Sequence, residues 1–220
     1  MDIIISQYNR EYLDNLISYN SALKSRNAML KNNDGIDETM LEVFDEKLCA
    51  NAAPIFRERT EFITNFIPVF KDFYRRISNK KEEVDLRYLS SLEHTELRDK
   101  LLQSRAKDKY LGFTTAGIHK DDLDMTLDGF SLKRTASQGQ SKSYLVAMKL
   151  AQFVFLKQIS GKTPILLLDD IFDKLDAERV ENIIREISED DFGQIFITNT
   201  NHEHTVGRSE ERRVGKECRS

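Results

Sequence analysis

The chain of 220 residues is 40% hydrophobic and 32% charged, which suits one large or two small folded domains with a sizeable core. Its apolar runs are far shorter than the roughly 18 residues that span a bilayer, and its start lacks the basic segment of a signal peptide, so we expect a cytoplasmic protein. The isolated Cys49 and Cys218 fit a reducing cytoplasm better than a disulfide scaffold. The net charge of −4 argues against coating nucleic acid through bulk charge but permits a local basic groove.

Residues 1–82 are predicted to form a helical arm. A helix at 6–32 follows from a narrow seam of residues spaced alternately three and four apart: Leu13, Leu16, Asn20, Leu23, Asn27 and Leu30. The turn sequence NNDG precedes a second helical pattern at 41–77, which Pro54 and Pro68 should kink or interrupt. Two long helices joined by a short turn make an antiparallel hairpin.

Residues 83–206 mix helical and strand patterns and are predicted to form an α/β lobe. Apolar residues alternate at three places that we predict to be strands: 84–88, 111–115 and 123–127. The last of these ends in Asp128-Gly129, a hairpin-type turn. A helix capped by Thr95 is expected between the first two strands, and residues 140–158 should form another. The apolar stripe of this second helix consists of Tyr144, Leu145, Met148, Ala151 and Phe155.

The strand predicted at 164–169 is apolar throughout, which is typical of a strand covered on both faces. A helix at 177–188 and a strand at 194–198 follow, and this alternation is one flank of a parallel α/β sheet. The last fourteen residues, 207–220, carry five basic residues and almost no apolar ones. They resemble translated vector sequence or a native disordered tail, so we leave them out of the fold.

Two parts of the stretch 160–170 resemble halves of an ATPase site. Gly161-Lys162-Thr163 would end a P-loop, but Leu156 stands where that motif needs its first Gly, and a strand follows where a helix is needed. We therefore predict a helix-to-strand turn there, and no Walker A motif in the chain. Asp169-Asp170, by contrast, end an apolar strand at the sheet edge where α/β proteins bind ligands. Mg²⁺ and a nucleotide phosphate would explain the two adjacent carboxylates, whereas the plainer reading is a loop start or a helix cap.

Ser137-Gln138-Gly139-Gln140 opens the helix predicted at 140–158. A serine, a flexible glycine and a helix N-terminus suit an anion, although Ser-x-Gly at a helix start is also a common cap. The order of this segment, its helix, the strand that ends in Asp169-Asp170 and the sequence FDKLD at 172–176 is far more specific than any one part.

Four segments invite comparison with known families: GIHKDD at 117–122, SQGQ at 137–140, LLLDDIFDKLD at 166–176 and LKSRNA at 23–28, in the arm. Together they closely resemble the RecF family of recombination mediators, over about residues 1–206; one departure is Ile118, where the family usually has Pro. That family belongs with the ABC-type ATPase heads of the SMC and Rad50 proteins, and its Walker A motif lies in an upstream lobe. The resemblance implies the α/β C-terminal lobe of such a head plus a helical antiparallel arm, taken from a longer protein.

In heads of this kind two subunits sandwich ATP, and the resemblance implies a role for each motif. Asp169 would hold Mg²⁺, mostly through water, and Asp170 would orient and polarise the attacking water. Residues 137–140 would be the signature that contacts the γ-phosphate of ATP held by the other subunit. Asp176 would lie in the D-loop, across the dimer seam, or would serve only as the N-cap of the helix at 177–188.

The implied function is that of a RecF-like DNA repair and replication protein. It would bind gapped DNA with its single- and double-stranded parts, form an ATP-dependent homodimer, and help a RecR-like mediator load a RecA-like recombinase, including in the SOS response. The family is a slow ATPase, and a chain without Walker A is not expected to hydrolyse ATP alone. Two alternatives stay open: a non-catalytic, partner-binding fragment, and a head fragment of an SMC/Rad50-type ATPase, which the short arm disfavours.

Basic residues that are weak candidates for DNA contact gather where the arm ends: Lys71, Arg75, Arg76, Lys80 and Lys81. Cations also favour a helix C-terminus, which is the plainer reading. A second, thinner patch consists of Lys24, Arg26 and Lys31. His119, Asp121 and Asp122 look like a metal cluster but are more simply a turn with local hydrogen bonds, kept as a weak site candidate; His202 and His204 are expected at the surface.

Overall fold

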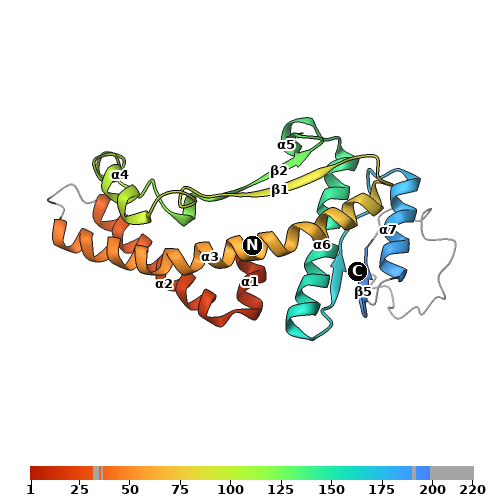
Figure 1. Cartoon of the computed structure of the whole chain (residues 1–220), viewed down its shortest axis with the longest axis horizontal. Coiled ribbons are helices and arrows are strands. Elements are labelled where there is room, and N and C mark those ends of the chain that lie inside the picture. Colours follow the sequence, from red (N-terminus) through yellow and green to blue (C-terminus); the bar gives the residue numbers. More distant parts are fainter. Residues whose placement is uncertain (32–34, 36, 190–191, 199–220) are drawn as a thin grey trace, which may run out of the picture.

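Figure 1 shows the computed structural model, which describes residues 1–31, 35, 37–189 and 192–198. Two long helices form an arm, a β-hairpin lies along it, and two further helices with a pair of parallel strands lie at one end. The elements are α1 (Asp2–Tyr8), α2 (Arg10–Lys31), α3 (Glu38–Ile77), β1 (Val84–Leu89), α4 (Leu97–Leu111), the 3-10 turn η1 (Ile118–Lys120), β2 (Asp122–Leu127), β3 (Phe130–Ser131), α5 (Leu132–Thr135), α6 (Gln138–Ser160), β4 (Leu166–Leu168), α7 (Ala177–Glu189) and β5 (Ile195–Ile197). Outside the described residues lie the predicted turn at 32–35 apart from Gly35, as well as His202, His204 and the tail 207–220.

Helix α3 is one uninterrupted helix of 40 residues, with both Pro54 and Pro68 inside it. The prolines were predicted to kink or interrupt the helix, and the interruption does not occur. Each costs about 3 kcal/mol in an isolated helix, but α3 buries one face along its whole length, against α2, α6, β1 and α7. This packing offsets the lost hydrogen bonds. The side chain of Asp37 caps the start of the helix by accepting from the N–H groups of Thr39 and Met40.

The first arm helix differs from its prediction in two ways. It is divided at Asn9, whose side chain accepts from the N–H of Tyr12 and so caps α2. Its buried face matches the predicted seam only in part, since Leu30 is buried, whereas Asn20 is exposed and Leu13 is half-buried. The buried residues of α2 are Tyr12, Tyr19, Ala22, Arg26 and Leu30. Aromatic side chains can take this face because the hydroxyls of Tyr12 and Tyr19 find partners inside, on Asp2 and His119.

A three-stranded antiparallel sheet, in the order β1–β2–β3, covers α3 along part of its length. The strands predicted at 84–88 and 123–127 are confirmed, and they pair in a register that sets Val84 opposite Leu127. Asp128 and Gly129 both adopt positive φ, 49° and 79°, as a two-residue hairpin turn requires. The exposed Phe130 follows this turn and begins β3.

The strand predicted at 111–115 does not exist. Helix α4 continues to Leu111 and ends at Gly112, whose φ of 73° is suited to a helix C-terminus. The two threonines that follow hydrogen-bond to side chains rather than to a neighbouring strand: Thr114 N–H to Asn27 and Thr115 N–H to Asp108. The prediction that Thr95 caps this helix was also wrong, because α4 begins at Leu97 and its N-cap residue is Glu96.

The C-terminal elements follow the predicted order of helix, strand, helix and strand. β4 and β5 are parallel, with Leu167 beside Phe196. Leu166 and Leu168 face the core, but the expected burial on both faces is absent in the described residues, because Leu167 is 69% and Phe196 is 58% exposed. Leu145, placed in the predicted stripe of α6, is also exposed. One face of the strand pair is therefore open and apolar.

One hydrophobic core runs through the described residues and across residue 82, where the arm was predicted to end. Aromatic rings of α3 pack on those of α6, with centroids 5.0 Å apart for Phe62 and Phe155 and 4.7 Å apart for Phe70 and Tyr144. The arm is thus built into the lobe rather than hinged to it. No helix in the described part of the chain combines the length and the apolar character that crossing a bilayer requires.

Candidate functional site at the edge of the parallel strands

The two adjacent aspartates lie at the carboxyl end of β4, as predicted. The hydroxyl of Thr198, at the end of the parallel strand β5, donates to the carboxylate of Asp169 and accepts from the backbone N–H of Asp170 at 3.0 Å. Asp170 has a φ of 47°, in the left-handed region, so the chain turns sharply there. Lys142 of α6 lies 4.0 Å from the Asp170 carboxylate. The sequence motif thus corresponds to a fixed corner where two strand ends and one helix meet.

Asp169 is exposed at this corner. Among the described residues, no group of three or more His, Cys, Asp or Glu side chains is arranged to hold a metal ion. Mg²⁺ differs from structural metals in this respect, because it is commonly bound by one or two carboxylates with phosphates and water completing the shell. Asp169 and Asp170 therefore fit a magnesium ion that arrives with a nucleotide, and not one held by protein side chains alone.

Ser137 caps α6, which begins at Gln138. Its hydroxyl oxygen accepts from the N–H of Gln140 at 3.1 Å, and the Gln140 side chain accepts in return from the N–H of Ser137 at 2.8 Å. This is a capping box. The cap uses a lone pair of the serine oxygen and leaves its O–H able to donate. The capping and anion-binding readings of this segment are therefore compatible.

Gly139 brings the start of α6 against the turn that follows β4. A Cβ atom at position 139 would lie 2.9 Å from the carbonyl oxygen of Lys174, so this approach requires glycine. Lys174 itself has a φ of 67°, a left-handed conformation in the same turn as Asp170. Two motifs that are separated by a long helix in the sequence are thus in direct contact at one edge of the molecule.

Asp176 caps α7. Its carboxylate accepts from the backbone N–H of Arg179 at 2.9 Å and from the Arg179 guanidinium at 3.2 Å. The capping role expected for Asp176 is thus present, and its D-loop role stays a prediction. The triplet Gly161-Lys162-Thr163 is the turn between α6 and β4, with Gly161 as C-cap at a φ of 65°, so the helix-to-strand reading is confirmed.

An ion pair between Glu82 and Arg179 was not found from the sequence. Arg179 donates to Glu82 at 2.6 Å, and the same carboxylate accepts from Gln140 at 2.9 Å and from the hydroxyl of Tyr74 at 2.6 Å. Burial raises the pKa of Glu82, but the hydrogen bonds from these three donors outweigh it and lower the pKa below its usual value. The pair joins the end of α3 to the starts of α6 and α7.

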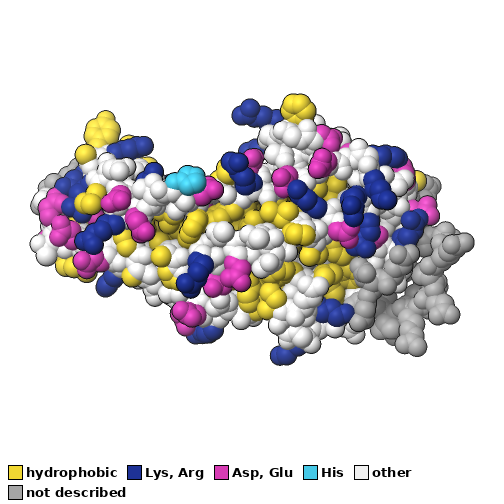
Figure 2. All heavy atoms as spheres, in the orientation of Figure 1, with side chains coloured by type: hydrophobic (Ala, Val, Ile, Leu, Met, Phe, Trp, Pro, Cys, Tyr) yellow, Lys and Arg dark blue, Asp and Glu magenta, His cyan; other side chains and the backbone are white. Residues whose placement is uncertain are grey.

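The predicted basic cluster is largely paired with acids. Arg75 binds Asp72, Arg76 binds Asp72 and Glu186, Lys81 binds Glu178, and Lys71 binds Asp85. Lys80 is exposed, in a turn with a φ of 60°. Figure 2 shows Lys and Arg side chains interspersed with Asp and Glu on this face rather than segregated from them. The DNA role of this cluster stays a prediction.

Arg26 does not belong to a surface patch, and that expectation was wrong. The residue is fully buried, and its guanidinium donates to Asp45 at 2.6 Å and to Asp108 at 2.8 Å. Arg105 of α4 binds the second oxygen of Asp45. Helix α4 is therefore attached to the arm largely through ion pairs, since only two of its apolar residues, Leu97 and Leu101, are buried.

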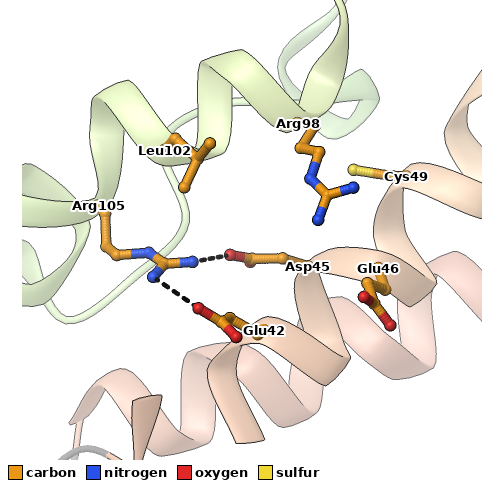
Figure 3. A pocket seen from close by; sticks show the side chains of 7 residues that line it. All are labelled: Glu42, Asp45, Glu46, Cys49, Arg98, Leu102 and Arg105. Atoms are coloured by element: carbon orange, nitrogen blue, oxygen red, sulfur yellow. Dashed lines mark hydrogen bonds and ion pairs between the residues drawn. The ribbon is translucent and has the colours of Figure 1, made fainter. Parts of the chain in front are cut away.

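A cavity of about 390 Å³ lies beside these ion pairs, between α3 and α4, and Figure 3 shows the side chains that line it. Acidic residues of α3 face arginines of α4 across it, and Arg105 points to Asp45 and Glu42. Burial raises the pKa of the Cys49 thiol on the cavity wall, which argues against a reactive thiolate. Three of the charged residues on the cavity wall, Glu42, Asp45 and Arg105, are thus paired with one another.

The loop at 117–122 is a turn, as its plainer reading held, but its hydrogen bonds reach the arm. His119 lies between the hydroxyl of Tyr19 at 2.9 Å and the carbonyl of Thr114 at 3.1 Å. Burial lowers the pKa of His119. Arg59 of α3 donates to the carbonyl of Ile118 and to Asp121. These contacts attach the β-hairpin to both arm helices.

Comparison with known proteins agrees with this architecture. No model of a protein family matches the chain. The curated protein from Bacteroides fragilis named DNA replication and repair protein RecF is 52% identical to this chain over 204 residues. The match covers 93% of this chain and 55% of that protein. The protein of that name from Parabacteroides distasonis is 50% identical over 204 residues, covering 93% of this chain and 56% of its own length.

Two solved structures of the recombination mediator protein RecF, described as RecF-ATPrS and RecF-ATP in the RecFOR pathway, have the same fold. They superpose with TM-scores of 0.79 and 0.78 at 30% and 28% identity, over 94% and 92% of this chain and 58% and 56% of theirs. The chain spans about half the length of the relatives it matches. With its α/β lobe and helical arm, the chain is a homologue of the DNA replication and repair proteins named RecF over the part of their length that it covers.

Proposed function

We propose that this chain is the C-terminal part of an ATP-switched DNA-repair protein, preceded in the complete protein by a lobe that carries Walker A. The complete protein would bind gapped DNA, dimerise with ATP, and help a RecR-like mediator load a RecA-like recombinase. The observation that supports this most is the contact of Gly139 with the Lys174 carbonyl, which places the signature segment and the Asp169-Asp170 corner on one edge. Both motifs can then meet nucleotide across a subunit interface.

At that edge the residues would divide the chemistry. Mg²⁺, held by Asp169 and by phosphate oxygens, would neutralise charge on the transferred phosphoryl group. Thr198 fixes the orientation of Asp169 through its hydroxyl. Asp170, in its left-handed turn, would orient water and accept its proton. The names of both solved relatives include ATP or an analogue of it, which supports the choice of nucleotide.

Ser137 would act in trans. Its oxygen is already a hydrogen-bond acceptor within the cap, so its hydrogen can be donated to a phosphate oxygen held by the other subunit. The N–H groups of the first turn of α6 add to the attraction, because a helix N-terminus carries partial positive charge. This contact would form only when two subunits close on ATP, and so it would make dimerisation depend on the nucleotide.

DNA contact would be directed at the phosphate backbone, with Arg75, Arg76, Lys80 and Lys81 as the candidates. Three of these four are engaged in ion pairs, so binding would exchange a carboxylate for a phosphate. Such an exchange gives weak, salt-dependent binding. The alternative function, a non-catalytic partner-binding module, is favoured by one observation, the open apolar face that includes Leu167 and Phe196.

The test is sedimentation of the complete protein with and without ATP and gapped DNA. We expect a monomer without nucleotide, and a dimer with ATP that also binds DNA. A protein that stays monomeric with ATP at micromolar concentration and does not bind gapped DNA would leave the partner-binding module as the better account.

A further inference from the structure

A half-buried ion pair connects the arm to the edge that carries Gly139 and Asp169. Glu82, five residues beyond the end of α3, and Arg179, in the first turn of α7, are each 13% exposed. Such a pair adds little net stability, because taking both charges out of water costs about as much as their attraction returns. Removing one partner, however, leaves an uncompensated charge. The pair is better suited to holding its elements in one relative position than to stabilising the fold.

Arg179 reaches the signature segment by two separate routes. In the first, the Glu82 oxygen that accepts from Arg179 also accepts from Gln140. In the second, the guanidinium donates to the hydroxyl of Ser143 at 3.0 Å, and that hydroxyl donates to the carbonyl of Gly139 at 2.9 Å. The third nitrogen of the same guanidinium binds Asp176. The Arg179 side chain is thus connected by hydrogen bonds both to the first turn of α6 and to the residue that caps α7.

The other end of the connection is the arm. α3 is continuous over 40 residues, or ~60 Å at 1.5 Å per residue. Its last turns are attached to α7 directly: Asn182 donates to the carbonyl of Ile77 at 3.1 Å, and Arg76 pairs with the buried Glu186 at 2.9 Å. These two contacts join the end of α3 directly to α7, so a shift of the arm would be passed on to α7 and its Arg179.

The turn between α3 and Glu82 is similarly constrained. Asn79 and Lys80 both have positive φ, 53° and 60°, which is unusual for residues other than glycine. Two consecutive residues in this conformation fix the direction in which the chain leaves the helix. The hydroxyl of Tyr74, on α3, then holds Glu82 from the helix side. The carboxylate is thus positioned by the arm and hydrogen-bonded by Arg179 and Gln140.

We propose that Glu82 and Arg179 are the positioning residues through which DNA held by the arm changes the signature segment and so sets the ATP-dependent dimerisation of the complete protein. This rests on the proposed function. In the proposed role neither residue contacts nucleotide or DNA. Their role is to couple two binding events, and it is measured by how far one event changes the other.

The experiment uses the complete protein with Glu82→Gln, which keeps the shape of the side chain and removes its charge. Dimerisation is titrated with ATP in the presence and absence of gapped DNA, and the two half-points are compared. We expect the effect of DNA on the ATP half-point to shrink about five-fold or more, the lower range of measured coupling, while ATP binding by the monomer and DNA binding stay near the parent values. Ser143→Ala removes only the second route, so the effect of DNA on the ATP half-point should be partly lost. This variant keeps the test valid if Glu82→Gln fails to fold.

The matched control is Glu178→Gln. Glu178 also bridges the end of the arm and α7, but it is exposed, and within the described part of the chain its partners are Asn79 at 2.8 Å and Lys81 at 2.5 Å rather than residues of α6. It should keep the full effect of DNA. If Glu82→Gln and Ser143→Ala both keep it as well, the coupling role is wrong while the proposed function stands. If the parent neither dimerises with ATP nor binds DNA, the proposed function fails and the coupling role fails with it.

Discussion

Gly139 and Lys174 touch at the start of α6, where a Cβ on the glycine would come within 2.9 Å of the lysine carbonyl oxygen. Gly139→Ala should therefore push the turn after β4 away from the signature segment. Overpacking of this kind costs about 1–3 kcal/mol, so the melting temperature should fall by several degrees, and ATP-dependent dimerisation of the complete protein should weaken. The neighbouring exposed Ser141→Ala is the control. Equal melting temperatures and equal dimerisation of the two variants would show that the contact is unimportant.

The chain alone should hydrolyse no ATP. Asp169 and Asp170 can place a metal ion and a water molecule, but the turn at Gly161 offers no cradle for a triphosphate, since it joins α6 to β4 and opens no helix. Phosphate release by the purified chain is the measurement, with Asp170→Asn as the background. Turnover above that background would mean that this chain holds the triphosphate without a Walker A motif.

The open face of the parallel strands should bind a fluorescent apolar dye. Leu167 and Phe196 lie side by side there, 69% and 58% exposed, and an exposed apolar patch of this kind is uncommon on monomeric proteins. Leu167→Thr should reduce dye fluorescence without lowering the melting temperature, because no buried contact is lost. Tyr110→Ser removes a side chain that is 90% exposed on α4, away from the parallel strands, and should change little. Equal dye fluorescence of the parent, Leu167→Thr and Tyr110→Ser proteins would show that the dye does not bind at the open face of the strands.

Most elements of the fold could be predicted because periodicity records which face of an element is buried. Burial alternates over the first four residues of β1, and the helix of residues 177–188 buries Val180 and Ile183, as their apolar patterns require. The strand at 123–127 was found from its alternating apolar residues alone, since most of its residues are half-buried. The strand expected at 111–115 failed for a physical reason. Asp108 is buried and paired with Arg26. Its carboxylate accepts a hydrogen bond from the N–H of Thr115, which in a sheet would have bonded to a neighbouring strand.

The site was predictable in part, for a related reason. Asp169, Asp170 and Ser137 stand in compact motifs whose local geometry the neighbouring residues determine, and the structure places them together at one edge. Glu82 and Arg179 are 97 residues apart, and nothing local distinguishes either from the other charged residues of the chain. A long-range ion pair leaves no periodic signal, so it becomes visible only when the elements are packed.

His119 should make the stability of the chain depend on pH near neutrality. Burial between Tyr19 and Thr114 lowers the pKa of His119 in the folded state, so the unfolded chain binds a proton more readily. Stability should be unaffected above the unfolded pKa of about 6.5, and should fall as pH drops below it, until the folded pKa is reached. Chemical denaturation at pH values of about 7.5 and 5.5, on either side of that pKa, measures this. His119→Gln should reduce the difference and not abolish it, because burial also lowers the pKa of the Met1 ammonium. The exposed His94→Gln should keep the full difference, and a parent protein equally stable at both pH values would refute the assignment.

Ser137 and Asp170 should give opposite effects on the dimer of the complete protein. Ser137→Arg places a long side chain at the start of α6, where the partner's phosphate would approach, and removes nothing from the subunit's own nucleotide cradle. ATP binding by the monomer should persist, while ATP-dependent dimerisation and hydrolysis fail together. Asp170→Asn keeps the size of the side chain but cannot accept a proton from water. Its dimers should form with ATP and then persist, because the sandwich assembles and the water is not activated.

Sedimentation of both variants, with and without ATP, decides between these expectations. Ser141→Arg offers a matched control substitution, since Ser141 lies near the start of α6, is exposed, and takes no part in the capping box. The Ser141→Arg protein should dimerise with ATP like the parent if the contact with the other subunit is made at Ser137 and not along the whole first turn of α6. A Ser137→Arg protein that dimerises normally with ATP would show that residues 137–140 are a helix cap and no more, as the bonds between Ser137 and Gln140 alone would require.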